Sequence, residues 1–253
     1  MRQIHIIGIG TGNPEHLTIQ AINVMNRADV IFIPLKGEGK EDLAVIRRDI
    51  CARYLSHGKT RIVEFDLPVR DAETKSYKDG VEAWHEAIAT IYCRLIDGLG
   101  EHEAGAFLVW GDPSLYDSTL RILERARGQS KEFSVRVVPG ISSLHALTAS
   151  HAIPLNPIGE PVQVTTGRRL ADEGIKAGTT VVMLDGQQAF ATVADDNADI
   201  FWGAYLGTDR EIKISGSLSE VSEDILRARA EARERHGWIM DTYLIRKRLV
   251  GEE

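Results

Sequence analysis

Three short stretches of glycine, proline and small polar residues each follow an apolar run that predicts a β-strand. They are residues 8–14 (Gly-Ile-Gly-Thr-Gly-Asn-Pro), 110–116 (Trp-Gly-Asp-Pro-Ser-Leu-Tyr) and 139–143 (Pro-Gly-Ile-Ser-Ser). Glycine lets a ligand or a second backbone segment come close, and aspartate and serine offer hydrogen-bond partners. Ligands of parallel sheets bind just beyond the carboxyl ends of the strands. The three stretches are therefore candidate binding turns.

The first turn departs from the dinucleotide-binding fingerprint. That motif needs a glycine three residues beyond Gly10, where this chain has Asn13, followed by Pro14. A proline removes an amide at the point where a helix N-terminus should offer donors to a pyrophosphate. Asp29 does lie near the expected ribose-binding position. A purely structural turn and a ligand loop both stay open, and an NAD-dependent dehydrogenase is a disfavoured alternative.

The second and third turns are also ambiguous when each is taken alone. Gly111-Asp112-Pro113 is ordinary turn chemistry, although Asp112 can accept from a hydroxyl or an ammonium group. Ser142 and Ser143 stand at a predicted helix start, where a hydroxyl needs no function beyond capping.

The elements that must position these turns alternate between strand and helix in the first part of the chain. Apolar runs at 4–9, 30–33, 62–65, 106–110 and 135–138 predict strands, with Pro34 ending the second, and amphipathic stretches between them predict helices. This alternation predicts a mainly parallel sheet covered on both faces. Strands crowd together after Pro139-Gly140, which predicts a mixed sheet. We therefore expect two α/β domains, residues 1–141 and 142–253.

Composition excludes several classes of protein. The chain has 253 residues, 43% of them hydrophobic, and a formal net charge of −7, which argues against nucleic acid as a partner. Its two cysteines, Cys51 and Cys93, predict no disulfide framework and suit a reducing compartment. The sequence shows no apolar run of membrane-spanning length and no secretory leader, so we expect a cytoplasmic protein.

The remaining polar clusters give weaker signals. The histidines lack metal-ligand spacing, as His145 and His151 are six residues apart on different helix faces, so we expect no metal. Arg168-Arg169 follows a predicted strand, where two guanidinium groups suit carboxylates. A plain surface turn explains the pair about as well.

The order and spacing of the three turns are more specific than any one of them. A Gly-x-Gly-x-Gly-x-Pro start, a Gly-Asp-Pro-x-x-Tyr turn and a Val-Pro-Gly-x-Ser-Ser turn together resemble the tetrapyrrole methylases, or class III methyltransferases. Ile153-Pro154-Leu155 and the apolar strand at 179–184 fall where that family has theirs. Segments at 34–37, 42–51, 65–71, 84–88 and 110–119 resemble one deacetylating branch of the family.

The resemblance implies a fold and a cofactor. The family has two α/β domains, with S-adenosylmethionine bound in the cleft between them. This cofactor has no phosphate to hold, so a proline in the first turn is tolerable. The residues that would border the cofactor are Pro14, Gly111, Asp112, Leu115, Ser142, Ser143, Met183, Leu184, Ala204 and Tyr205.

The resemblance also implies an activity. It is methyl transfer to ring carbon C1 of a corrin precursor, with loss of an acetyl group and release of S-adenosylhomocysteine. The candidates for catalysis are Asp112, Tyr116 and His145, and those for binding the substrate carboxylates are Lys36, Arg168 and Arg169. Other precorrin methylases, relatives acting on ribosomal RNA or on a modified histidine, and a non-catalytic tetrapyrrole carrier stay open. Because this family commonly dimerises, a homodimer is a further expectation.

Overall fold

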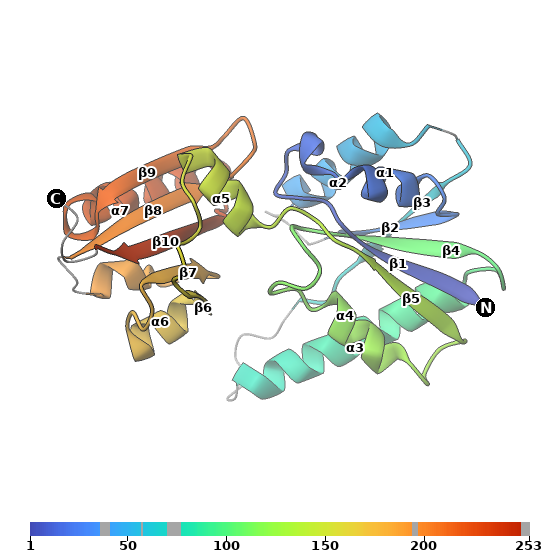
Figure 1. Cartoon of the computed structure of the whole chain (residues 1–253). Helices are drawn as coiled ribbons and strands as arrows, with labels where there is room; N and C mark the ends of the chain where they lie inside the picture. The colour runs from blue at the N-terminus through green and yellow to red at the C-terminus, as the bar shows by residue number, and fades with distance from the viewer. Residues whose placement is uncertain (36–40, 57, 70–76, 194–196, 249–253) are drawn as a thin grey trace. The chain divides into compact units, whose positions relative to one another are not determined.

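The computed structural model describes residues 1–35, 41–56, 58–69, 77–193 and 197–248. The chain divides into two compact units, Met1–Ser142 and Ser143–Glu253. Each unit has its own five-stranded sheet (Figure 1).

The first unit is built on a sheet in which every strand pairing is parallel. Its strand order is β3-β2-β4-β1-β5, which confirms the predicted parallel sheet. The strands are β1 (Arg2–Gly8), β2 (Val30–Leu35), β3 (Arg61–Asp66), β4 (Ala104–Val109) and β5 (Phe133–Val138). The helices are the 3-10 turn η1 (Pro14–His16), α1 (Ile19–Met25), α2 (Glu41–Tyr54), α3 (Tyr77–Asp97) and α4 (Thr119–Ala126).

Helices cover both faces of this sheet (Figure 1). Helices α1 and α2 bury one face in a core that includes Ile7, Ile31 and Cys51. Helices α3 and α4 bury the other face in a core that includes Phe107 and Cys93. The arrangement follows from strands that are apolar on both sides, since such strands need a helical layer on each face. Both thiols are therefore buried, one in each core.

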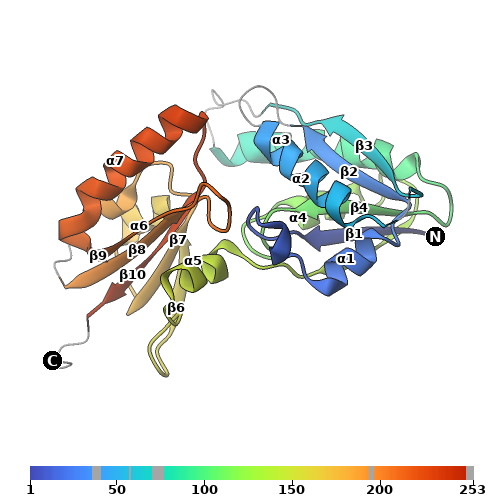
Figure 2. The same cartoon turned by 90° about the horizontal axis from the view of Figure 1, so that it is seen from above.

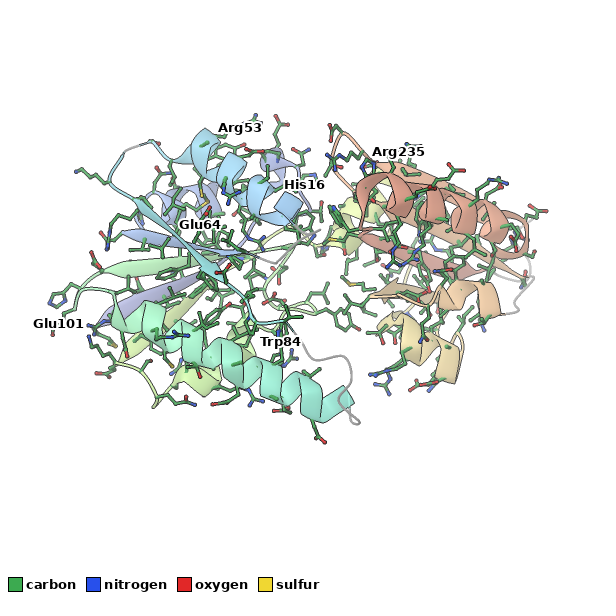
Figure 3. All side chains as sticks on the ribbon, turned by 180° about the vertical axis from the view of Figure 1, so that it is seen from behind. His16, Arg53, Glu64, Trp84, Glu101 and Arg235 are labelled. Carbon is green, nitrogen blue, oxygen red and sulfur yellow. The ribbon has the colours of Figure 1, made fainter. Side chains whose placement is uncertain are left out.

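Local signals set several of the helix boundaries. The Thr18 hydroxyl accepts from the backbone N–H of Ala21 at 3.0 Å, so this residue caps α1 as its position predicts. Ile19 is the first residue of that helix, and its side chain is 78% exposed. At the surface, Glu64 on β3, which is labelled in Figure 3, pairs with Arg48 on α2 at 2.5 Å.

Pro34 does not end the second strand as expected. β2 continues through Pro34 to Leu35, in register with Phe65 and Asp66 of β3. The pairing of β2 with β4 stops at Phe32, so Pro34 lies where β2 has only one hydrogen-bonded neighbour. A proline is tolerated there because its missing N–H interrupts at most one ladder.

The second unit has a mixed sheet of order β6-β7-β10-β8-β9. Among the described strands of this unit, β6 and β7 pair in parallel and the other pairings are antiparallel, which confirms the predicted mixed sheet. Helix α5 contacts β10 and β8 on the face of the sheet opposite α7 (Figures 1 and 2). The strands are β6 (Val162–Thr166), β7 (Thr179–Met183), β8 (Ala198–Ala204), β9 (Ile212–Ser217) and β10 (Asp241–Lys247). The helices are α5 (Ser143–His151), α6 (Gly167–Glu173), the 3-10 turn η2 (Ala189–Thr192) and α7 (Leu218–His236).

The strand order of the first sheet contains a switch point. β1 and β4 are neighbours, but the chain leaves β1 toward the α1 face and leaves β4 toward the α4 face. Ligands of open parallel sheets bind where such neighbouring connections diverge. Within the described part of the chain, no helix has both the length and the apolar character needed to cross a membrane.

Candidate functional site

The three predicted binding turns of the first unit meet at the switch point. They follow β1, β4 and β5, which are adjacent in the sheet. An isolated antiparallel bridge joins the first two turns, since the N–H of Gly111 donates to the carbonyl of Gly10 at 2.8 Å. Turns about 100 residues apart in sequence are thus joined because their strands are parallel neighbours.

Three glycines allow this close approach. A Cβ at Gly8 would lie 2.6 Å from the nitrogen of Gly140 and 2.7 Å from the carbonyl oxygen of Gly111. A Cβ at Gly140 would lie 2.2 Å from that same oxygen. Gly111 differs, because its φ is +65° and a Cβ there would meet only the Cα of Ser142, at 3.8 Å. Glycine is therefore required at 8 and 140 by contact between backbones, and at 111 by backbone conformation.

Asp112 connects the second turn to the third. Its Oδ2 accepts from the N–H of Gly140 at 2.8 Å, and its Oδ1 accepts from the N–H and hydroxyl of Ser114 at 2.8 and 2.5 Å. Both carboxylate oxygens therefore take part in holding the turns together. This arrangement gives Asp112 a positioning role, which the sequence prediction of catalysis did not include.

The first turn has no helix N-terminus of regular length beside it. Asn13 caps the three-residue η1 by accepting from the N–H of Glu15, and Pro14 is its first residue. The α-helix begins only at Ile19. Because the pyrophosphate of a dinucleotide needs the N-terminal amides of a longer helix, this geometry does not favour the dehydrogenase alternative.

Three predicted site residues other than glycine have left-handed backbone. Tyr116, Leu184 and Tyr205 have φ values of 51°, 55° and 49°, and the only other non-glycine residues of this kind in the described chain are Ala152 and Gln188. Such conformations persist only where the surroundings enforce them, and they gather at functional sites. Tyr116 is exposed, and so is Leu184.

The predicted residues of the second unit gather at one end of its sheet. Thr166 pairs with Met183, and Ala204 pairs with Asp241, so β6, β7 and β8 end beside the start of β10. Leu184 and Tyr205 follow these strand ends directly. Ser143 and His145 lie on α5; His145 is exposed, and Ser143 Oγ is buried with no hydrogen-bond partner among the described residues.

Three predicted residues have surroundings that the sequence did not indicate. The side chain of Tyr205 points into the core, where its hydroxyl donates to the carbonyl of Trp238 at 2.5 Å, so only its backbone is available to a ligand. Arg168 and Arg169 lie in the first turn of α6, not in a loop, and Arg169 pairs with Glu173 at 2.8 Å. Lys36 lies outside the described residues.

Arg47 is a buried residue that the sequence reasoning missed. Its Nε donates to the carbonyl of Leu108 at 2.9 Å and its Nη1 to that of Leu43 at 2.9 Å, so it holds the end of β4 to α2. Burial lowers its pKa to about 10, although Tyr92 and Asp117 act against this fall. The available signal was its helical spacing from Leu43, which places it on the buried face of α2.

The comparisons with known proteins agree with this geometry. The family model for Tetrapyrrole (Corrin/Porphyrin) Methylases matches residues 3–222. Precorrin-6A synthase [deacetylating] from a Sinorhizobium species is 58% identical over 250 residues, which cover 98% of this chain and 96% of that protein.

Solved structures show the same fold. A cobalamin synthesis related protein (CobF) from Corynebacterium diphtheriae has a TM-score of 0.82 and 38% identity, covering 98% of this chain and 99% of that chain. Uroporphyrin-III C-methyltransferase from Thermus thermophilus, in complex with S-adenosylhomocysteine, has a TM-score of 0.57 at 17% identity, covering 96% and 91%. The family model and the full-length relatives place this chain in the tetrapyrrole methylase family.

Proposed function

We propose that this protein transfers a methyl group from S-adenosylmethionine to ring carbon C1 of the corrin precursor precorrin-5 and removes an acetyl group from it. The observation that carries the proposal is the meeting of the three turns at the switch point of the first sheet. The near full-length similarity to precorrin-6A synthase [deacetylating] supports the deacetylating reaction over other reactions of the family.

The residues present suit S-adenosylmethionine. A Cβ at Gly111 would meet only the Cα of Ser142, at 3.8 Å, so the backbone there is less crowded than at Gly8 and Gly140 and a ligand can approach it. Ser143 Oγ is buried and has no hydrogen-bond partner within the described part of the chain, so an incoming polar group would satisfy it. We propose that Pro14, Leu115 and Ser142 complete this part of the site, and that Met183, Leu184, Ala204 and the backbone of Tyr205 border the adenine.

The chemistry asks the protein mainly to position its substrates. S-adenosylmethionine supplies a methyl group that its sulfonium already makes electrophilic. The chain must then hold the ring carbon in line with that methyl group and exclude competing water. Loss of the acetyl group needs water to add to its carbonyl. The carbon–carbon bond then breaks, acetate leaves, and the electron pair stays on the ring. Tyr116 and His145 are exposed candidates for moving the proton, whereas both oxygens of Asp112 already accept hydrogen bonds.

The reaction can be tested with methyl-labelled S-adenosylmethionine and a panel of precorrins. We expect one precorrin to gain a labelled methyl group and to release acetate, which mass spectrometry and acetate analysis would show. Methyl gain without acetate would indicate another methylase activity of the same family. No methyl gain with any precorrin, by protein that binds the cofactor, would contradict the proposal.

Cofactor preference is a separate prediction. The protein should bind S-adenosylhomocysteine and ignore NAD and NADP, because the turn after β1 leads only into the three-residue η1, which begins with a proline and cannot hold a pyrophosphate. Isothermal titration calorimetry with each ligand measures this. Heat of binding with a nicotinamide dinucleotide and none with S-adenosylhomocysteine would overturn it.

Substrate carboxylates give a third prediction. Replacing both Arg168 and Arg169 with glutamine should weaken binding of the tetrapyrrole about tenfold or more, because charge-assisted contacts are lost, and should leave S-adenosylhomocysteine affinity unchanged. Added salt should weaken binding to the wild type more than to the double variant. Fluorescence titration with the tetrapyrrole at two salt concentrations measures both effects.

A matched control removes the same charge elsewhere. Arg227 and Arg233 lie on α7 of the same unit, where both are exposed. Replacing this pair with glutamine should change tetrapyrrole binding little. If both double variants bind the tetrapyrrole equally, Arg168 and Arg169 are only surface residues. Arg169 must also exchange its contact with Glu173 for one with the substrate.

A further inference from the structure

The turn after β7 holds two side-chain-bearing residues in left-handed backbone. Leu184 has a φ of 55° and Gln188 a φ of 58°, and they are the first and last residues of the five-residue segment 184–188. Leu184 is also 67% exposed, which leaves no burial of its own side chain to favour this conformation. Contacts with other residues must therefore hold the turn in this conformation.

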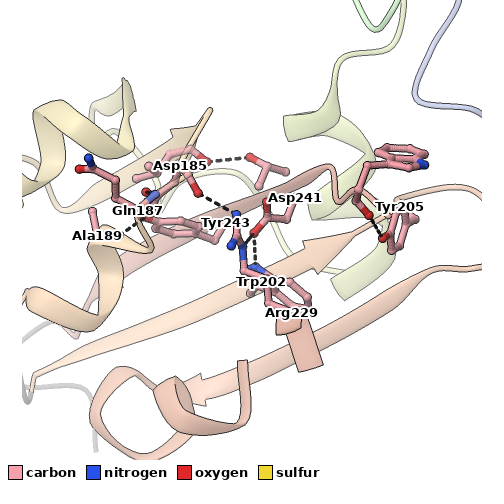
Figure 4. A network of polar contacts seen from close by, with 11 residues as sticks. Asp185, Gln187, Ala189, Trp202, Tyr205, Arg229, Asp241 and Tyr243 are labelled. Atoms are coloured by element: carbon pink, nitrogen blue, oxygen red, sulfur yellow. Dashed lines mark hydrogen bonds and ion pairs between the residues drawn. The ribbon is translucent and has the colours of Figure 1, made fainter. Parts of the chain in front are cut away.

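Asp185, which is 6% exposed, holds the turn through hydrogen bonds of its side chain and its backbone (Figure 4). Its Oδ2 accepts from the N–H of Ala189 at 2.7 Å and from the hydroxyl of Tyr243 at 2.7 Å. Its Oδ1 accepts from the N–H of Gln187 at 3.2 Å. Its backbone carbonyl accepts from Nη2 of Arg229 at 3.0 Å. Both the side chain and the main chain of one residue are thus fixed by partners from three elements.

Those partners are fixed in turn by a second set of contacts. Nε of Arg229 donates to Oδ2 of Asp241 at 2.9 Å, and Nε1 of Trp202 donates to the same oxygen at 3.0 Å (Figure 4). The side chains of Arg229 and Asp241 are 7% and 8% exposed. We call Asp185, Trp202, Arg229, Asp241 and Tyr243 the Asp185 cluster. It connects the end of β7 to β8, β10 and α7.

A cluster made only for stability would not need these charges. Buried ion pairs are often replaceable by apolar residues without loss of stability, whereas they do fix one geometry. The hydroxyl of Tyr243 remains a donor, because burial and the neighbouring Asp185 raise its pKa. Gly167 at the start of α6 is tied to the same geometry, since a Cβ there would lie 2.1 Å from Oδ1 of Asp185.

We propose that the Asp185 cluster is a positioning element for the cofactor. It holds Leu184 in its left-handed, exposed conformation, so that the turn presents a preformed surface to the adenine of S-adenosylmethionine. The residues of the cluster act through Leu184 and need not touch the cofactor themselves. This inference rests on the proposed function, because it assumes that the 183–184 turn borders the adenine.

The test removes one hydroxyl. Tyr243→Phe deletes the donor to Asp185 and keeps the ring, which packs edge-on against Phe190 at 5.3 Å. We expect S-adenosylhomocysteine to bind about tenfold more weakly, and the KM for S-adenosylmethionine to rise similarly while kcat changes little. Calorimetry and steady-state kinetics with the full chain measure these values.

The control variant is Thr242→Val, one residue earlier on β10. The Thr242 hydroxyl is buried and donates to the carbonyl of Val182 at 2.8 Å, so its loss costs a comparable hydrogen bond without touching the turn. Its affinity for S-adenosylhomocysteine should equal that of the wild type. Equal affinity in Tyr243→Phe, or equal weakening in both variants, would overturn the positioning role.

Two further measurements keep the result interpretable. Asp185→Asn retains an acceptor for the N–H of Ala189, so it should fold and bind more tightly than Asp185→Ala. If Tyr243→Phe fails to fold, the affinities of Asp185→Asn and Asp185→Ala for S-adenosylhomocysteine test the proposal instead. Equal affinities in these two variants would contradict it. A wild type that binds no S-adenosylhomocysteine would instead contradict the proposed function.

Discussion

Replacing Gly140 with alanine is expected to destabilise the first unit by about 3 kcal/mol, a fall in Tm on the order of 10 °C. The new Cβ would lie 2.2 Å from the carbonyl oxygen of Gly111 and 2.8 Å from the backbone of Gly8, so two turns must move apart. Backbone atoms held by neighbouring strands cannot give way as a flexible side chain can. Thermal and urea unfolding followed by circular dichroism measure the loss.

Gly111→Ala is the matched comparison. There a Cβ meets nothing closer than 3.8 Å, and the cost is only that of left-handed backbone, about 1 kcal/mol. This variant should fold but should bind S-adenosylhomocysteine more weakly, because the methyl group enters the open space beside the turn. If Gly140→Ala proves no less stable than Gly111→Ala, the turns are not in contact as described. Alanine is preferable to valine at 111, since a β-branched residue tolerates a positive φ poorly.

The second large effect is expected for Arg229→Met. The variant leaves the carboxylate of Asp241 buried without its cation and the carbonyl of Asp185 without its donor, at a cost of about 3–5 kcal/mol. Adding Asp241→Asn should recover part of the loss, because the stranded charge is then removed. The free energy of unfolding of each variant, from urea titration, gives the comparison.

Arg248→Met provides the exposed counterpart. Arg248 pairs with Asp199 at 2.6 Å, but the two side chains are 44% and 35% exposed. Such a surface pair contributes about 1 kcal/mol or less. A loss of equal size in Arg229→Met and Arg248→Met would mean that solvent reaches the Asp185 cluster.

Much of the fold could be predicted because its signals are local. The parallel sheet follows from apolar runs separated by amphipathic helices, and the Thr18 cap follows from a single hydroxyl. The helix α6 was missed because its seven residues begin with glycine and bury only two positions, too few for a periodic apolar stripe. The prediction that Pro34 ends the second strand was wrong. Whether a proline fits within a strand depends on which neighbours β2 has at that point, and a single sequence does not contain that information.

The candidate site also has a part that could be predicted from the sequence and a part that could not. The three turns were predictable, since the carboxyl ends of neighbouring parallel strands share one edge of a sheet. The Asp185 cluster was not, because its contacts join residues far apart in sequence. Tyr243 is 58 positions from Asp185, and Arg229 is 44 positions from it. The inward direction of the Tyr205 side chain was equally hidden, because it is set by contacts with Trp238 and His236.

The two buried cysteines allow local opening of the first unit to be measured by thiol labelling. Cys51, on α2, lies in the core that α1 and α2 form with the sheet, and Cys93, on α3, lies in the core that α3 and α4 form with it. Burial raises the pKa of Cys51 to about 11 and also raises that of Cys93, so neither reacts readily as a thiolate in the closed state. Reaction with a thiol reagent must therefore wait for local opening. Because the whole sequence contains only these two cysteines, single Cys→Ala variants would let the labelling rate time the opening of each helical layer separately, with no signal from the second unit.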